Sequence, residues 1–415
     1  MLNVDISNIW SCLSLPELLS SEKEIFDAHM RLRSNESDGP DLHGWLGRPD
    51  SIMGRQIHSI RRIANRIQSQ SQILIVCGCG SIWRGARAAV RLLRRPDGMQ
   101  VIFAGDTLSD RQWRELSSLL EHNDVSLHLI SDDGKAMGVN VTARGLRWLM
   151  ERKYGAEAKD RISIATLVGS PLHRMGQEEG YELFPLPRET GGSSSVLAAG
   201  GLIPVAAAGA DPLELWEGAQ EAFRELDIRS FDNPAWLYAA ARCLLGQKGR
   251  GREILCVTDR TLLPFGSWWQ HRCWGHEGGA LQADTALIPD SLRSLDRLAQ
   301  SGAPVFETLL RFDPPQRKIP VEMDWKDYDG LSCLSGHSWD ETEAAVADAM
   351  IETHSEVGVP LLELQAGPLT TQSVGSLFLF FELADCLTAA MNGSDPFREY
   401  PPLTTPAAIR RLKNK

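Results

Sequence analysis

One short segment holds several side chains that can transfer protons or bind a metal. It reads His271-Arg272-Cys273-Trp274-Gly275-His276-Glu277. Zinc sites usually show CxxC or HExxH-type spacing, which this segment lacks, so we expect no metal ion. His276 beside Glu277 is instead a candidate acid–base pair, because imidazole and carboxylate groups exchange protons near neutral pH. A pocket wall that has lost its chemistry is the third interpretation, and the residue types alone leave it open.

Two glycine-containing segments follow predicted strands. Gly78-Cys79-Gly80-Ser81 precedes a predicted helix, and backbone amides at a helix start bind phosphate or carboxylate groups. The segment from Ser131 to Gly138 follows a later strand and contains Lys135. A structural alternative for the first segment is a turn that uses glycine only for its backbone freedom. The candidate ligand contacts in these two segments are Gly80, Ser81, Ser131, Gly134 and Lys135.

Alternating strands and helices must position these segments. Short apolar runs predict strands at 73–76, 101–104, 125–130, 162–167, 253–258, 304–312 and 359–364. Helix-period patterns predict helices at 81–93, 109–120, 141–153, 212–226, 234–245 and 338–354. This alternation predicts an α/β fold with parallel sheets that are covered by helices on both faces.

The length of 415 residues exceeds one typical core and indicates two subdomains. We expect an N-terminal helical segment at 1–44 and a first αβα unit at 45–185. A second αβα unit at 186–395 and a C-terminal arm at 396–415 complete the expected division. The arm is rich in proline and then basic, as is typical of a segment that lies over a surface.

The net charge of −11 argues against nucleic-acid and anionic-membrane partners, because both would be repelled at long range. The eight cysteines are scattered through apolar contexts, which indicates reduced thiols. No signal peptide is recognisable near Met1, and the apolar stretch 196–208 is too short to span a bilayer. We expect a cytoplasmic protein that needs no cofactor.

The segment from Glu189 to Pro204, Glu-Thr-Gly-Gly-Ser-Ser-Ser-Val-Leu-Ala-Ala-Gly-Gly-Leu-Ile-Pro, resembles the glucose-6-phosphate isomerase signature G-G-R-[FY]-S-[VL]-x-[ST]-A-V-G-L-[PL]-P. Further matches extend from about residue 73 to 397. They include the turn that begins at Gly78, Asn233-Pro234-Ala235-Trp236, Ser267-Trp268-Trp269-Gln270 and residues 375–382. The resemblance implies two sandwich subdomains of the sugar-isomerase (SIS) type and a homodimer. It also implies a small sugar or sugar-derived ligand that contacts Gly192, Ser193 and His271.

The catalytic positions of the family depart from its pattern. Ser193 stands where the resemblance places an arginine that stabilises the enediolate, although serines here also suit a helix cap. The family motif W-W-K-Q-L-x-G-E puts Gly275 at the base position, or His276 if one residue is inserted. Arg293 occupies the ring-opening histidine of D-L-H-S-L-G, and arginine cannot exchange protons near neutral pH. No lysine follows Pro396-Phe397 where the family has its last one.

The phosphate loop of the family, S-K-S-G-T-T-T-E, corresponds here to Ser131-Asp132-Asp133-Gly134-Lys135-Ala136-Met137-Gly138. Two carboxylates thus face the phosphate position. A pair of unit charges about 4 Å apart repels by about 1 kcal/mol in water and about 4 kcal/mol at an effective dielectric constant of 20. A sugar phosphate is therefore disfavoured unless Lys135 or a bound cation offsets the charge.

The sequence supports two main hypotheses of function. The first is a member of this family that has lost the standard isomerisation and binds a small polar ligand or a partner. The second is an active aldose–ketose isomerase in which His276 or Glu277 is the base and Arg293 the cation, and which accepts a sugar without a dianionic phosphate. The remaining alternative is a standard glucose-6-phosphate isomerase in which other residues of the chain occupy the catalytic positions.

Overall fold

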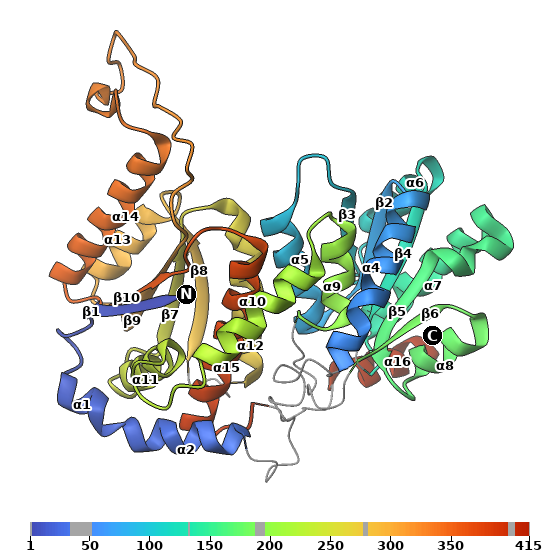
Figure 1. The fold of residues 1–415 in the computed structure, drawn as a ribbon, viewed down its shortest axis with the longest axis horizontal. Coiled ribbons are helices and arrows are strands. Elements are labelled where there is room, and N and C mark those ends of the chain that lie inside the picture. The colour runs from blue at the N-terminus through green and yellow to red at the C-terminus, as the bar shows by residue number, and fades with distance from the viewer. Residues whose placement is uncertain are drawn as a thin grey trace. The chain divides into compact units, whose positions relative to one another are not determined.

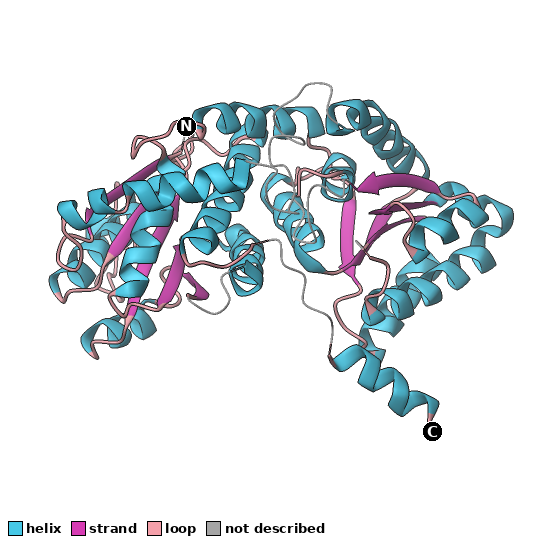
Figure 2. Ribbon diagram, turned by 90° about the horizontal axis from the view of Figure 1, so that it is seen from below, coloured by secondary structure: helices cyan, strands magenta, loops and turns pink. Residues whose placement is uncertain are grey.

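A computed structural model describes residues 2–33, 52–131, 133–186, 196–276, 281–396 and 403–414. The chain divides into two compact units. We call residues 30–223 with 395–415 the first unit, and residues 1–29 with 224–394 the second unit. Each unit contains one five-stranded sheet with helices on both faces (Figures 1 and 2).

The first unit has a sheet of five parallel strands in the order β3-β2-β4-β5-β6. The strands are β2 Ile73–Gly78, β3 Gln100–Ala104, β4 Val125–Ile130, β5 Ile162–Leu167 and β6 Glu182–Leu186. The helices are α4 Ile52–Gln70, α5 Gly80–Leu93, α6 Asp110–His122, α7 Met137–Tyr154, α8 Pro171–Glu179, α9 Ala199–Ala207, α10 Pro212–Glu225 and α16 Thr404–Lys413. Every residue of β2 and β4 is buried, as expected of strands covered on both faces.

Alternate side chains of these strands pack on opposite faces of the sheet. Ile73, Ile75 and Cys77 of β2 belong to a core cluster that also contains residues of α6, α7 and α8. Helices α4, α5 and α9 pack against one another and form the other layer. The period-2 alternation of a strand therefore accounts for both cores of this unit.

The second unit has the strand order β1-β10-β9-β7-β8. The strands are β1 Asn3–Asn8, β7 Arg252–Val257, β8 Gln282–Leu287, β9 Val305–Arg311 and β10 Leu361–Gln365. The helices are α1 Leu15–Ser20, α2 Glu22–Arg33, α11 Pro234–Gln247, α12 Leu263–His276, α13 Leu292–Gln300, α14 Trp339–Glu356 and α15 Thr371–Met391. Helices α13 and α14 share a core cluster with one face of this sheet. Helices α11, α12 and α15 contact one another.

Helix α15 is long and apolar enough to cross a bilayer by length and composition alone. In its most apolar window of 18 residues, 94% of the residues are buried within the protein. This is the pattern of a central core helix, and α15 packs accordingly against α11 and α12.

One expectation from the sequence needs correction, and the division into units differs in detail. Residues 3–8 form strand β1, not a helix or loop, because Val4 and Ile6 alternate with polar neighbours and pair antiparallel with β10. The C-terminal tail contains a helix, α16. Residues 1–29 group with the second unit and residues 186–223 with the first, so the unit borders do not coincide with residues 44 and 185.

Candidate functional site

The strand order of the first unit places two predicted ligand loops side by side. Strand β2 lies between β3 and β4. The strand that follows β2 is therefore added on one side of this pair, and the strand that follows β4 is added on the other side. In this arrangement ligands bind at the carboxyl ends of the two strands where the order reverses. Gly78 and Ile130, the last residues of β2 and β4, are register partners. We call the region formed by residues 78–81, 131 and 133–136 the switch crevice.

The first loop of the switch crevice is shaped by glycine. A Cβ atom at Gly78 would lie 2.8 Å from the carbonyl oxygen of Ile130, so only glycine allows this close approach. Gly80 has a φ of +81°, and the space where its Cβ would be is open. Cys79 is the N-cap of α5 and its side chain does not cap the helix, which leaves the amides of the first turn for other acceptors.

Ser81 provides a second polar group in this loop. Its hydroxyl is buried, and within the described residues it has no hydrogen-bond partner. A buried hydroxyl without a partner is unfavourable, and a bound ligand or water would satisfy it. Burial raises the pKa of the nearby Cys77 thiol, which favours its protonated form.

The second loop is held by hydrogen bonds of its own. The backbone N–H of Gly134 donates to Ser131 Oγ at 3.2 Å, and Asn140 Nδ2 donates to the Gly134 carbonyl at 3.0 Å. Lys135 Nζ lies 3.8 Å from Asp133 Oδ2, and both side chains are exposed. Asp133 thus offsets the positive charge of Lys135 at the place where an anion would bind. Asp132, Gly192 and Ser193 lie outside the described residues.

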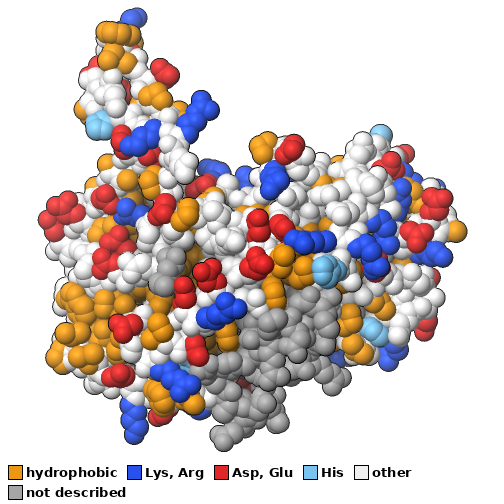
Figure 3. Space-filling view, viewed as in Figure 1, with side chains coloured by type: hydrophobic (Ala, Val, Ile, Leu, Met, Phe, Trp, Pro, Cys, Tyr) orange, Lys and Arg blue, Asp and Glu red, His pale blue; other side chains and the backbone are white. Residues whose placement is uncertain are grey.

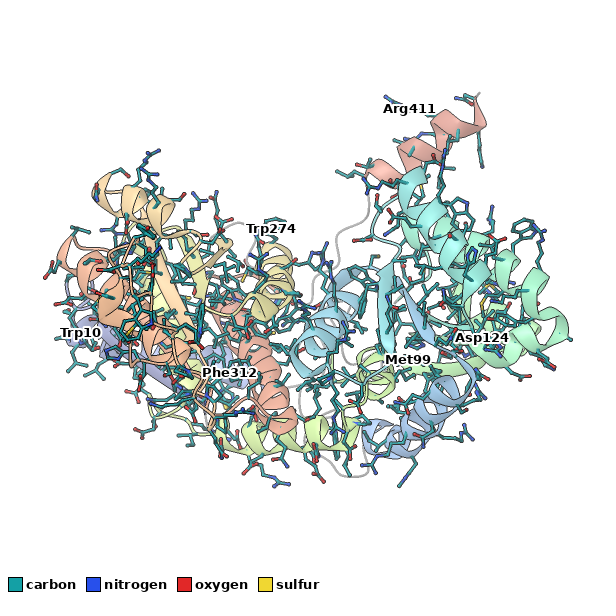
Figure 4. The ribbon with its side chains drawn as sticks, turned by 90° about the horizontal axis from the view of Figure 1, so that it is seen from above. Trp10, Met99, Asp124, Trp274, Phe312 and Arg411 are labelled. Atoms are coloured by element: carbon teal, nitrogen blue, oxygen red, sulfur yellow. The ribbon has the colours of Figure 1, made fainter. Side chains whose placement is uncertain are left out.

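The proton-transfer segment lies at the end of α12. His271 is half-buried, whereas Trp274 is 63% exposed and lies near the end of the helix (Figure 4). Gly275 is exposed, and a Cβ atom there would have no neighbour within 4 Å. Glu277 and the side chain of His276 fall outside the part of the chain that the structure describes. Within that part, no group of three or more His, Cys, Asp or Glu side chains could hold a metal ion.

A buried network of charged groups fixes this end of α12. Arg272 Nε donates to Asp385 Oδ2 at 3.2 Å, and Arg242 Nη1 lies 3.3 Å from the other oxygen of Asp385. Arg242 Nε donates to Glu253 Oε2 at 2.6 Å, and Tyr238 donates its hydroxyl to Glu253 Oε1 at 2.6 Å. Burial raises the pKa of Asp385, although the two arginines oppose this shift. The network joins α11, α12 and α15 to β7.

This network was not among the predictions from the sequence. The sequence nonetheless contains a signal for it, because Arg242 is an isolated charge in a long apolar stretch and Asp385 lies in another that holds only Glu382 besides. Such charges are rarely buried unless they are paired.

The predicted cation Arg293 lies far from α12's end. Helix α12 ends at His276 before β8, and Arg293 is exposed in the first turn of α13 after β8. The six residues of β8 separate them, which is roughly 20 Å at about 3.3 Å per residue. Arg293 and the end of α12 therefore lie at opposite ends of β8, and the fold of a single chain does not bring them together.

Comparison with known sequences identifies the relatives of this chain. A scan against models of protein families finds no match. Glucose-6-phosphate isomerase from Staphylococcus haemolyticus is 32% identical over 383 residues, which cover 89% of this chain and 86% of the relative. The enzyme of the same name from Clostridium perfringens is 32% identical over 412 residues, with coverage of 95% and 91%. This chain belongs to the glucose-6-phosphate isomerase family. The family resemblance stated from the sequence is thereby confirmed.

Solved structures agree in fold. A glucose-6-phosphate isomerase from Chlamydia trachomatis matches with a TM-score of 0.74 over 96% of this chain and 84% of its own, at 14% identity. A hypothetical protein from Thermus thermophilus matches with a TM-score of 0.87 over the whole of both chains, at 18% identity. Tagatose-6-phosphate ketose/aldose isomerase from Escherichia coli matches with a TM-score of 0.51. These likenesses confirm the predicted α/β fold of two sugar-isomerase units.

Proposed function

We propose that this member of the glucose-6-phosphate isomerase family binds a small, sugar-derived ligand and no longer interconverts glucose 6-phosphate and fructose 6-phosphate. The observation that carries the proposal is the end of α12. Alignment without gaps puts Gly275 at the base position, and the open space around it contains no carboxylate among the described residues. Moving a proton between adjacent carbons requires a base within hydrogen-bond reach.

The switch crevice supports ligand binding but argues against a phosphate dianion. The uncapped first turn of α5 and the partnerless Ser81 hydroxyl offer hydrogen bonds to a polar ligand. Asp133 is exposed beside Lys135 and offsets its charge, so these two described side chains together add no net positive charge for a dianion. We therefore infer a neutral or singly charged sugar derivative as the ligand.

A thermal-shift screen combined with a coupled assay tests this proposal. Sugars, sugar phosphates and sugar acids are added separately to the purified protein, and fructose 6-phosphate turnover is measured in parallel. We expect stabilisation by a sugar or sugar acid without turnover. Turnover near the rate of the family's active enzymes refutes the loss of isomerisation, and the absence of any stabilising compound refutes the binding role.

The alternative is an active aldose–ketose isomerase in which His276 or Glu277 is the base. The Arg272–Asp385 pair favours it, because this pair fixes the last turns of α12 and would hold a base there in one position. Arg293 would join that base from a second copy of the chain, since within one chain the two lie at opposite ends of β8. A His276→Ala variant that keeps full turnover would exclude His276 from the role of base.

We propose a homodimer as the assembly of this protein. The segment 312–338, between β9 and α14, projects from the second unit and exposes hydrophobic side chains (Figures 1 and 3). Trp325 is 89% exposed and Tyr328 83%. Aromatic side chains at this exposure are typical of interface anchors. No disulfide joins the described cysteines, most of which are buried, and this agrees with the cytoplasmic location that we propose.

A further inference from the structure

A second pocket lies in the first unit, between α6 and α7. Its volume is about 310 Å³, and it is bounded by the loop after β3 and by one face of each helix. The lining residues are Thr107, Leu108, Ser109, Asp110, Gln112, Trp113, Leu116, Val141, Thr142 and Gly145. We propose that this pocket binds a small bicyclic aromatic carboxylate.

The walls of the pocket favour a flat apolar body. Trp113 and Leu116 of α6 line the pocket together with Gly145 of α7. A Cβ atom at Gly145 would lie 2.4 Å from the Trp113 ring, so glycine is what lets this indole lie against α7. Leu108 and Val141 are exposed apolar residues that also line it. A cavity of roughly 150 Å³ accepts benzene, so a pocket of this size accepts two fused rings.

The polar groups of the pocket favour an acceptor on the ligand. Thr142 is only 7% exposed, lines the pocket, and has no hydrogen bond from its hydroxyl to any described residue. Ser109 is the N-cap of α6 but its side chain does not cap the helix, so the amides of the first turn are free to donate. Asp110 also lines the pocket, and Arg114 Nη2 donates to its Oδ2 at 2.7 Å, which offsets the negative charge. Hydroxyl, amides and helix dipole together favour a carboxylate.

Titration with indole-3-carboxylate, followed by saturation-transfer NMR and calorimetry, tests the proposal on the full-length protein. We expect binding at about 1 mM or tighter, the range for a compound of this size. Thr142→Val keeps the shape and removes the hydroxyl, and we expect about 3- to 10-fold weaker binding. Thr142→Ser keeps the hydroxyl and should bind indole-3-carboxylate about as tightly as the wild type. Thr353→Val, an exposed threonine of α14, is the matched control and should bind like the wild type.

A third variant separates loss of the pocket from loss of folding. Val141→Trp changes an exposed residue and narrows the pocket, so it should abolish binding while the melting temperature stays near that of the wild type. The proposal is overturned if the wild type does not bind indole-3-carboxylate, or if Val141→Trp binds it equally well. Equal affinity for neutral indole and for indole-3-carboxylate would overturn the assignment of a carboxylate.

Discussion

Arg272 and Asp385 form an ion pair of 3.2 Å in the interior of the second unit, where both side chains are almost completely excluded from solvent. Arg242 contacts the same carboxylate and also pairs with Glu253, so each of these buried charges has an opposite charge beside it. Paired charges of this kind add little net stability compared with apolar residues, but removing one partner leaves a buried charge without compensation. The geometry of α12 therefore depends on every member of the network.

We predict that Arg272→Met destabilises the protein by about 3–5 kcal/mol, because Asp385 then loses one of its two cations. Urea unfolding measures the change in the free energy of unfolding. Arg252→Met is the matched control, since Arg252 pairs with Asp284 near the surface and such pairs contribute about 0–1 kcal/mol. Equal effects of the two substitutions would contradict the importance we give to burial.

The sequence predicts the apolar strands of this fold better than its buried charges. The buried strands β2, β4 and β5 are short, continuous apolar runs, and this pattern is visible in the sequence. A charged residue such as Arg242 is normally expected at the surface. Its burial cannot be predicted from the residue type alone, because it depends on partners that are far apart in the chain and meet only in the fold. Strand β8 (Gln282–Leu287) has three polar residues among six and lacks a strand signal, and it forms through pairing with β7.

The candidate site was predictable to a similar extent. The switch crevice follows from glycine-containing turns after two strands, although only the strand order shows that the two turns are neighbours. The separation of Arg293 from the end of α12 was not predictable from spacing, because it depends on the direction of β8 within the sheet. The pocket between α6 and α7 was missed as well, since its lining combines ordinary apolar and polar types.

Stability should depend on pH through His354. Its Nδ1 lies 2.9 Å from Glu307 Oε2, and its Nε2 lies 3.0 Å from Asp296 Oδ1. Burial disfavours the charged imidazolium, but the hydrogen bonds and charges of Glu307 and Asp296 outweigh burial and raise the pKa above its ordinary value of 6.5. The folded protein thus binds this proton more tightly than the unfolded chain. The resulting stabilisation is complete below about pH 6.5 and is lost as the pH rises through the raised pKa.

Unfolding free energies measured from pH 6 to pH 9 check this dependence. We expect the wild type to lose stability over this range and His354→Gln to give a flatter curve. Parallel curves for the two proteins would show that another group titrates.

The homodimer should depend on the projecting segment 312–338. We predict that Trp325→Ala combined with Tyr328→Ala weakens self-association by at least about tenfold, because these are the most exposed aromatic side chains of the segment. Light scattering after size exclusion measures the mass. Trp148→Ala, on an exposed position of α7, is the control and should keep the wild-type mass. A monomeric wild type, or a dimer that survives the double substitution, would reject this interface.

Gly80 provides the sharpest test of the switch crevice. Its φ of +81° is strained for any other residue, so Gly80→Ala should destabilise the protein by about 1–2 kcal/mol and shift the first amides of α5. Gly249 has a φ of +86° and equally open surroundings. It lies between α11 and β7 in the second unit, whereas the switch crevice belongs to the sheet of the first unit. Gly249→Ala should therefore show the same loss of stability while keeping the thermal shift given by whichever sugar or sugar acid stabilises the wild type. Gly80→Ala should lose that shift, because the amides that would hold the ligand have moved. If both variants keep it, the ligand binds outside the switch crevice.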